Sequence, residues 1–140
     1  MASCAAPGYF PPVPVGGRRY VDGGGVSVTD ADVLVRERLD EVVVLAPMAS
    51  AGADPRRGAL SRLDARFRRY ATGRLAREVD RLEAAGCHVR VLAPTPEDLL
   101  VIGGNLMAAG RRLPVFETAL RTTPATLADG AAAARPAVAS

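Results

Sequence analysis

The sequence predicts an α/β fold, because two short valine-rich stretches flank one long amphipathic helix. Residues 42–46 form a continuous apolar run, which is typical of a strand buried on both faces of a parallel sheet. Residues 88–92 read as a second strand. A strand, a helix and a strand in this order predict a βαβ unit with parallel strands. With 140 residues, the chain has room for one ordinary domain.

The elements before this unit are short. Residues 1–18 are rich in proline and glycine and are expected to form a loop, since proline lacks a backbone N–H donor. Residues 18–21 read as a short strand, which ends at Asp22-Gly23-Gly24-Gly25. Residues 29–39 predict a short helical or mixed segment, with Thr29, Asp30 or Asp32 as candidate caps.

The clearest element is a helix over residues 59–85. Its apolar residues recur every three or four positions and form one stripe: Leu60, Leu63, Phe67, Ala71, Leu75, Val79 and Leu82. Gly86 is well placed to end the helix. Residues 96–102 and 115–120 suggest two further short helices.

Domain organisation follows from these elements. We treat residues 1–128 as one unit and expect the alanine-rich residues 129–140 to be a disordered tail. Three short strands and one long helix make a thin sheet, in which nothing covers the second face of strand 42–46. The chain therefore reads as a piece of a larger layered α/β structure.

Composition excludes several classes of function. The net charge is +3, but every basic residue is arginine, and aromatic residues make up only 4%, so a nucleic-acid surface is not expected. No apolar stretch is long enough to span a bilayer. Cys4 and Cys87 support neither a metal site nor a disulfide scaffold, and we expect reduced thiols in a cytoplasmic protein.

One motif carries chemistry. Asp22-Gly23-Gly24 places a carboxylate at the end of a strand, and the glycines allow another backbone or a substrate to approach closely. Asp-Gly-Gly alone is common in tight turns. Its surroundings make it more specific: Ala2-Ser3-Cys4-Ala5-Ala6-Pro7-Gly8-Tyr9-Phe10-Pro11-Pro12 before it, and Thr29-Asp30-Ala31-Asp32 after it.

This combination resembles the C-terminal signature of bacterial patatin-like phospholipases. In that family a small-residue segment leads into a Pro-Phe-Pro-Pro-like loop, and a strand then ends in Asp-Gly-Gly or Asp-Gly-Ala. The similarity covers roughly residues 2–120 and is most specific before position 32. The resemblance implies a partial three-layer patatin-like fold, related to the α/β-hydrolases.

The resemblance also implies a serine–aspartate dyad that hydrolyses acyl esters of lipids without a cofactor or a metal. Asp22 matches the dyad aspartate, which accepts the proton of the serine hydroxyl with no histidine between them, and Gly23 and Gly24 support the motif. Asp30 stands where the family usually has asparagine. If the Asp30 side chain lies near Asp22, the second carboxylate would raise the pKa of the two carboxyl groups as a pair. A helix-capping role for Asp30 is the commoner explanation.

The chain lacks two elements that the family needs: a glycine-rich loop for the oxyanion and a Gly-x-Ser-x-Gly elbow for the nucleophile. Only Ser50 comes close, but Met48 replaces the first glycine of the elbow. We therefore expect a fragment that is inactive alone and needs an upstream chain to complete the domain. A non-catalytic remnant or interaction module from the same family is the alternative.

The charged face of the long helix has two possible explanations. The arginine-rich face of the long helix could dock on an anionic membrane, but a solvated face with ion pairs inside the helix is the commoner explanation. His88, the only histidine, is expected to be structural.

Overall fold

A computed structural model of the chain describes residues 2–52, 55, 59–104 and 108–128, and the predicted tail 129–140 lies outside them. Its centre is the expected βαβ unit of β3 (Glu41–Leu45), α1 (Ala59–Ala84) and β4 (His88–Leu92). The two strands pair in parallel, with Val42 opposite Val89 and Val44 opposite Val91. The predicted α/β fold is therefore confirmed.

One face of this sheet is buried and the other is open. Val42 and Val44 pack with Leu75, Val79 and Leu82 of α1, together with Val89 and Val91. The alternate residues of β3 point away from α1, and Val43 is 51% exposed and Leu45 70% exposed. The prediction that this strand is buried on both faces is wrong for this chain, because within the described residues α1 covers one face only. In the described part of the chain, the expected uncovered second face is confirmed at Val43 and Leu45.

The apolar stripe of α1 accounts for its packing. Ala71, Leu75, Val79 and Leu82 are buried at the expected spacing, whereas Phe67 is 39% exposed. The side chains of Leu60 and Leu63, also assigned to the stripe, lie outside the described residues. After α1 the chain turns at Gly86, whose φ of 89° lies in the left-handed region that favours glycine.

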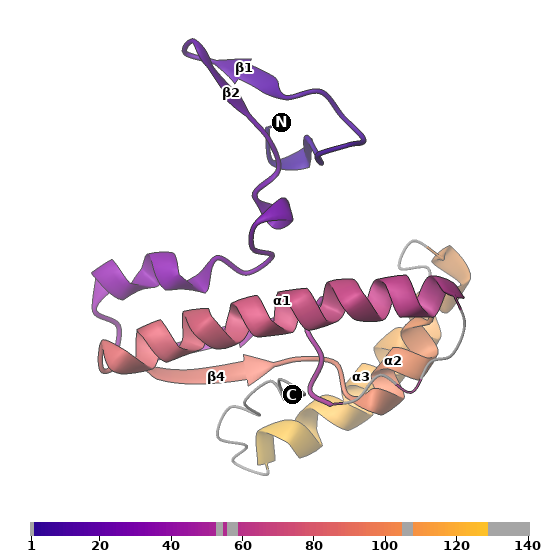
Figure 1. Ribbon diagram of the computed structural model, residues 1–140. Coiled ribbons are helices and arrows are strands. Elements are labelled where there is room, and N and C mark those ends of the chain that lie inside the picture. Colours follow the sequence, from indigo (N-terminus) through magenta and orange to yellow (C-terminus); the bar gives the residue numbers. More distant parts are fainter. Residues whose placement is uncertain (1, 53–54, 56–58, 105–107, 129–140) are drawn as a thin grey trace.

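The N-terminal part forms a separate hairpin that projects away from α1 and its sheet (Figure 1). Strands β1 (Val13–Val15) and β2 (Arg18–Tyr20) pair antiparallel across Gly16 and Gly17, which both have positive φ, as a tight two-residue hairpin turn requires. The expected strand near residue 18 is thus present, but it pairs with β1. The described strands form two separate two-stranded sheets, which corrects the single thin sheet predicted from the sequence. Pro14 is tolerated because β1 is an edge strand.

Three short 3₁₀ helices accompany these strands: η1 (Ala2–Cys4), η2 (Gly23–Gly25) and η3 (Ala31–Glu37). The last of them lies along α1 (Figure 1). It accounts for the helical or mixed segment expected over residues 29–39.

The C-terminal part consists of α2 (Pro96–Ile102), the short η4 (Ala109–Arg111) and α3 (Arg112–Ala128). Thr95 and Asp98 form a capping box at the start of α2. Helix α3 is longer than the predicted 115–120 and is tied to α2 by the hydrogen bond from Thr122 to Asp98 (2.9 Å). None of the helices in the described ranges is long and apolar enough to cross a membrane.

Candidate functional site: the Asp22 turn

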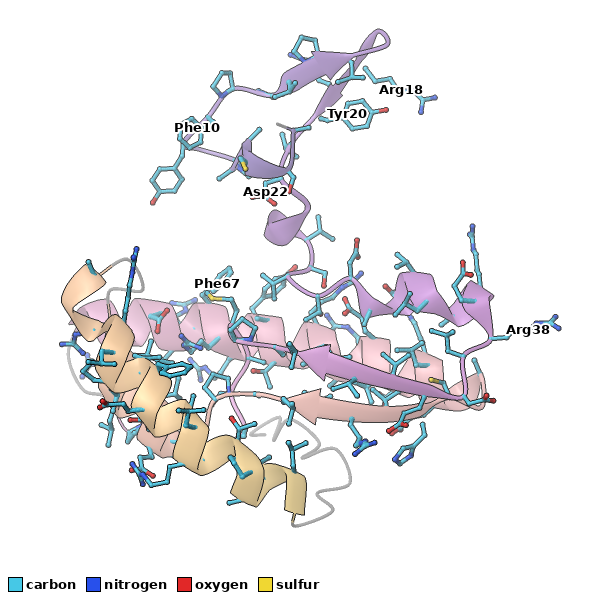
Figure 2. All side chains as sticks on the ribbon, turned by 180° about the vertical axis from the view of Figure 1, so that it is seen from behind. Phe10, Arg18, Tyr20, Asp22, Arg38 and Phe67 are labelled. Atoms are coloured by element: carbon cyan, nitrogen blue, oxygen red, sulfur yellow. The ribbon has the colours of Figure 1, made fainter. Side chains whose placement is uncertain are left out.

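Asp22 stands at the base of the hairpin, where the chain leaves β2 and runs toward α1 (Figure 2). It occupies the N-cap of η2, and its Oδ1 accepts a hydrogen bond from the Gly24 amide at 2.9 Å. A Cβ atom at Gly24 would lie 3.2 Å from that oxygen. Glycine at position 24 therefore allows the carboxylate to fold back onto the turn.

The backbone of Asp22 is anchored on the side of the N-terminal segment. Its amide donates to the carbonyl of Ala5 at 3.0 Å, and Ala5 is 3% exposed. Pro7 lies in van der Waals contact with the position that a Cβ of Gly25 would take. The residues before the hairpin and the glycines after it thus hold the same turn.

The Asp22 carboxylate keeps one oxygen available. Oδ1 accepts from Gly24, and no described residue donates to Oδ2. Val21 and Val26, on either side of the turn, are 46% and 61% exposed. Phe67 lies on the side of α1 that faces this segment (Figure 2). The turn can therefore offer a carboxylate oxygen to a hydroxyl group brought to it from outside this segment.

Downstream of the turn, the chain is fixed to α1 through Glu78. The Ser27 hydroxyl donates to Oε1 of Glu78 at 2.5 Å, and the Thr29 hydroxyl donates to Oε2 at 2.6 Å. The amide of Ala31 also donates to Oε2, at 3.0 Å. Arg74 lies one helical turn earlier and forms an ion pair with Oε1 at 3.2 Å. Glu78 is completely buried, and the three hydrogen bonds and the ion pair compensate its charge.

The charged residues of α1 were expected on a solvated face, and the structure corrects this expectation for Glu78 and Arg68, which are both buried. Arg68 is 1% exposed and donates to the carbonyls of Pro47 (2.8 Å) and Ala49 (3.2 Å). A signal was present, since Glu78 lies three positions after Leu75 and four before Leu82, within the helical spacing of the buried stripe. A charged residue in an apolar row indicates a buried and partnered charge.

Asp30 does not cap η3, although it occupies the N-cap position: its φ is 49° and its side chain makes no capping hydrogen bond. Its carboxylate lies within 4.8 Å of those of Asp32 and Glu78. Asp32 forms an ion pair with Arg81, and both oxygens of Glu78 are engaged as described above. Contacts within the protein therefore already engage the carboxylates of Asp32 and Glu78.

Ser50 does not form a nucleophile elbow. Its hydroxyl donates to the carbonyl of Gly52 at 2.6 Å, and its amide donates to Thr72 at 3.1 Å. Among the described contacts, none joins Ser50 to Asp22. Ser50 is therefore part of the loop after β3, and the Asp22 turn has no serine partner within the described part of the chain.

A cavity of about 370 Å³ lies at the carboxyl ends of β3 and β4. Its walls are mostly apolar and include Leu45, Leu92, Ile102 and Val115, with Asp98 and Thr122 among the polar residues. The N-terminal segment with Asp22 does not line it. The cavity therefore lies between the ends of the strands and α3, away from the Asp22 turn.

Comparison with known proteins finds a similarity in the N-terminal quarter of the chain. The sequence model of the patatin-like phospholipases matches residues 1–35, a segment that includes the hairpin and Asp22. No curated protein and no solved structure gives a match to the chain. Over these residues the chain is therefore similar to a family of lipid hydrolases, whereas the resemblance was expected over roughly residues 2–120.

Proposed function

We propose that this chain is the C-terminal segment of a patatin-like lipid acyl hydrolase, to which it contributes the dyad aspartate Asp22. The observation that supports the proposal best is the family match over residues 1–35. In that segment Asp22 stands on a glycine turn, and one of its carboxylate oxygens receives no hydrogen bond from a described residue. A purely structural aspartate in a turn would explain neither the family match nor the carboxylate oxygen that is left without a donor.

In the proposed reaction Asp22 acts as the general base. Its carboxylate takes the proton of a serine hydroxyl, and the serine oxygen forms a bond with the acyl carbon of the ester. The ester C–O bond then breaks, and the leaving alcohol receives the proton from Asp22. Water hydrolyses the acyl-serine in a second step with the same base. No cofactor or metal enters either step.

The proposal requires an upstream segment that carries the serine and the oxyanion donors. The open face of the β3–β4 sheet supports such a partner, because parallel sheets are normally covered on both faces. Val43 and Leu45 are apolar side chains on that open face. An upstream segment that adds strands and a covering layer would bury them and bring its serine to Asp22.

The substrate class that follows is an acyl ester of a lipid, met at a membrane surface. The outer side of α1 carries arginines that are exposed and that support peripheral contact with anionic lipid: Arg62, Arg66, Arg69 and Arg77. Nucleic acid is not a proposed partner, since the chain offers few aromatic side chains for base stacking.

Complementation tests the proposal. We expect the 140-residue chain to show no turnover of short p-nitrophenyl esters, and we expect turnover when it is joined to an upstream segment with a Gly-x-Ser-x-Gly elbow. Ser50→Ala is the matched control and should change neither result. Turnover by the chain alone that disappears in Ser50→Ala would contradict the proposal. A joined protein that folds but shows no turnover would favour the non-catalytic remnant.

A further inference from the structure

Glu78 collects hydrogen bonds from one short segment that begins soon after the Asp22 turn. Its three hydrogen-bond donors are the Ser27 hydroxyl, the Thr29 hydroxyl and the amide of Ala31, which lie 47 to 51 positions before it in the chain. Arg74 on the same helix adds an ion pair. A fully buried carboxylate with these partners fixes residues 27–31 to α1, because each lost bond would leave a buried polar group unsatisfied.

Neighbouring side chains of α1 extend this attachment. The Tyr70 hydroxyl donates to the carbonyl of Val26 at 3.0 Å, and Arg81 forms an ion pair with Asp32. Tyr70, Glu78 and Arg81 follow one another at helical spacing and so share one face of α1. That face holds residues 26–32, and Glu78 is its only fully buried member.

A short series of hydrogen bonds joins this segment to Asp22. The carbonyl of Gly23 accepts from the amides of Val26 (2.8 Å) and Ser27 (3.0 Å). The Asp22 carboxylate accepts from Gly24 within the same turn. The Ser27 hydroxyl, bound to Glu78, also accepts from the amide of Asp30 at 2.9 Å. Displacing Ser27 would therefore displace the turn that carries Asp22.

The arrangement requires a carboxylate at position 78. Oε2 receives the Thr29 hydroxyl and the Ala31 amide, and Oε1 receives the Ser27 hydroxyl and Arg74. A glutamine has one oxygen and one amide nitrogen that can only donate. In either orientation, that nitrogen would face the Ala31 amide or the Arg74 guanidinium, which also only donate.

We propose that Glu78 is a positioning residue for Asp22: it sets where the Asp22 carboxylate stands relative to the serine hydroxyl that it must deprotonate. This inference rests on the proposed function, because it assigns Glu78 a role at the same site. Glu78 itself touches neither the substrate nor the reacting atoms.

The first experiment uses the 140-residue chain and needs no activity. Amide hydrogen exchange is compared between the native chain, Glu78→Gln and Glu83→Gln, since Glu83 is an exposed acid of the same helix. In Glu78→Gln the amides of residues 24–31 should exchange roughly 10- to 100-fold faster, while those of β3 and β4 are unchanged. Glu83→Gln should match the native chain. Unchanged exchange over residues 24–31 in Glu78→Gln would overturn the inference.

The second experiment uses the joined protein described under the proposed function. Glu78→Gln should lower kcat by about 10- to 100-fold and leave KM unchanged, because a displaced base slows the chemistry without removing substrate contacts. Glu83→Gln should retain full turnover. If Asp22→Asn abolishes turnover and Glu78→Gln does not change kcat, the positioning role is wrong and the proposed function stands. If Asp22→Asn retains turnover, the proposed function fails, and the exchange experiment alone decides whether Glu78 holds the segment.

Thr29→Val covers the case in which Glu78→Gln does not fold. It removes one donor to Oε2 with little change in side-chain volume and leaves the other three partners of Glu78 in place. We expect faster exchange at Ala31 and a smaller fall in kcat. Native exchange and native kcat in Thr29→Val would contradict the inference.

Discussion

At the scale of single residues, the conformation of the Asp22 carboxylate depends on the glycine two positions later. The carboxylate folds back onto the amide of Gly24, and position 24 has no room for a Cβ atom at an ordinary contact distance from it. Gly23 differs, since a Cβ there would meet nothing within 4 Å. The two glycines of the motif therefore have different functions, and only Gly24 is needed for the close approach.

This difference predicts the outcome of two matched substitutions. Gly24→Ala should make the Asp22 carboxylate shift by a few tenths of an ångström and weaken its hydrogen bond, at a cost of up to about 1 kcal/mol. Gly23→Ala should be neutral or stabilise the chain by about 0.4–1 kcal/mol, because it reduces the freedom of the unfolded chain. Urea unfolding of both variants measures the difference. Equal stability of the two variants would show that the Gly24 contact does not constrain the turn.

At the scale of elements, α1 organises the molecule with two of its faces. One face carries the apolar residues that cover the β3–β4 sheet, and the adjoining face, which begins at Glu78, holds residues 26–32. Arg68 adds a third attachment, because its guanidinium binds the carbonyls of the loop that follows β3. The helix thus connects the sheet to the segment that carries the site.

Arg68→Met tests the attachment of that loop. The substitution removes charged hydrogen bonds to two carbonyls in a buried place, so we expect a loss of about 2 kcal/mol in the free energy of unfolding. Arg69→Met is the matched control: Arg69 is exposed, and its change should lie within about 0.5 kcal/mol. Thermal or urea unfolding of the two variants measures both values. A similar effect in both would contradict the role assigned to Arg68.

The elements that could be predicted from sequence are those whose signal is local. The βαβ unit and its long helix follow from hydrophobic spacing. The pairing of β1 with β2 was missed because Pro14 and the flanking glycines obscure a three-residue edge strand. The Glu78 contacts could not be read in advance, since Ser27 lies 51 positions away and nothing in either local sequence specifies the other.

For the candidate site, the sequence predicts Asp22 and its glycines, but it does not predict the contacts that hold them. The N-terminal contact to Ala5 and the attachment to α1 depend on tertiary structure. The role of Asp30 could not be predicted from the sequence either. Its type and position suggested a cap, yet its left-handed backbone directs the side chain elsewhere.

At the scale of the whole molecule, the described chain has an uncovered sheet face and a projecting hairpin. Val43 and Leu45 stand on the open face, and the described sheet has only two strands. Unpaired strand edges and exposed apolar side chains favour association with another chain. These features agree with the proposal that an upstream segment completes the structure.

This predicts how the chain behaves when it is isolated. We expect marginal stability and self-association in sedimentation experiments, and we expect Leu45→Gln to reduce the association without a large loss of stability, since Leu45 is mostly exposed. Leu82→Ala is the contrasting variant: Leu82 is 1% exposed and its truncation should cost about 2–5 kcal/mol. A monodisperse monomer with a cooperative, highly stable thermal transition would contradict the incomplete-sheet account.

The central claim is that Asp22 is the base of a serine–aspartate dyad, and its most direct test is the hydrolysis rate of Asp22→Asn in the joined protein. Asparagine nearly matches aspartate in size and can still accept the Gly24 hydrogen bond, but it cannot take the serine proton. Asp30→Asn is the control, since Asp30 is exposed and makes no capping bond. We predict a loss of about 100- to 10,000-fold for Asp22→Asn and a near-native rate for Asp30→Asn. Near-native turnover in Asp22→Asn would contradict the assignment of the active site.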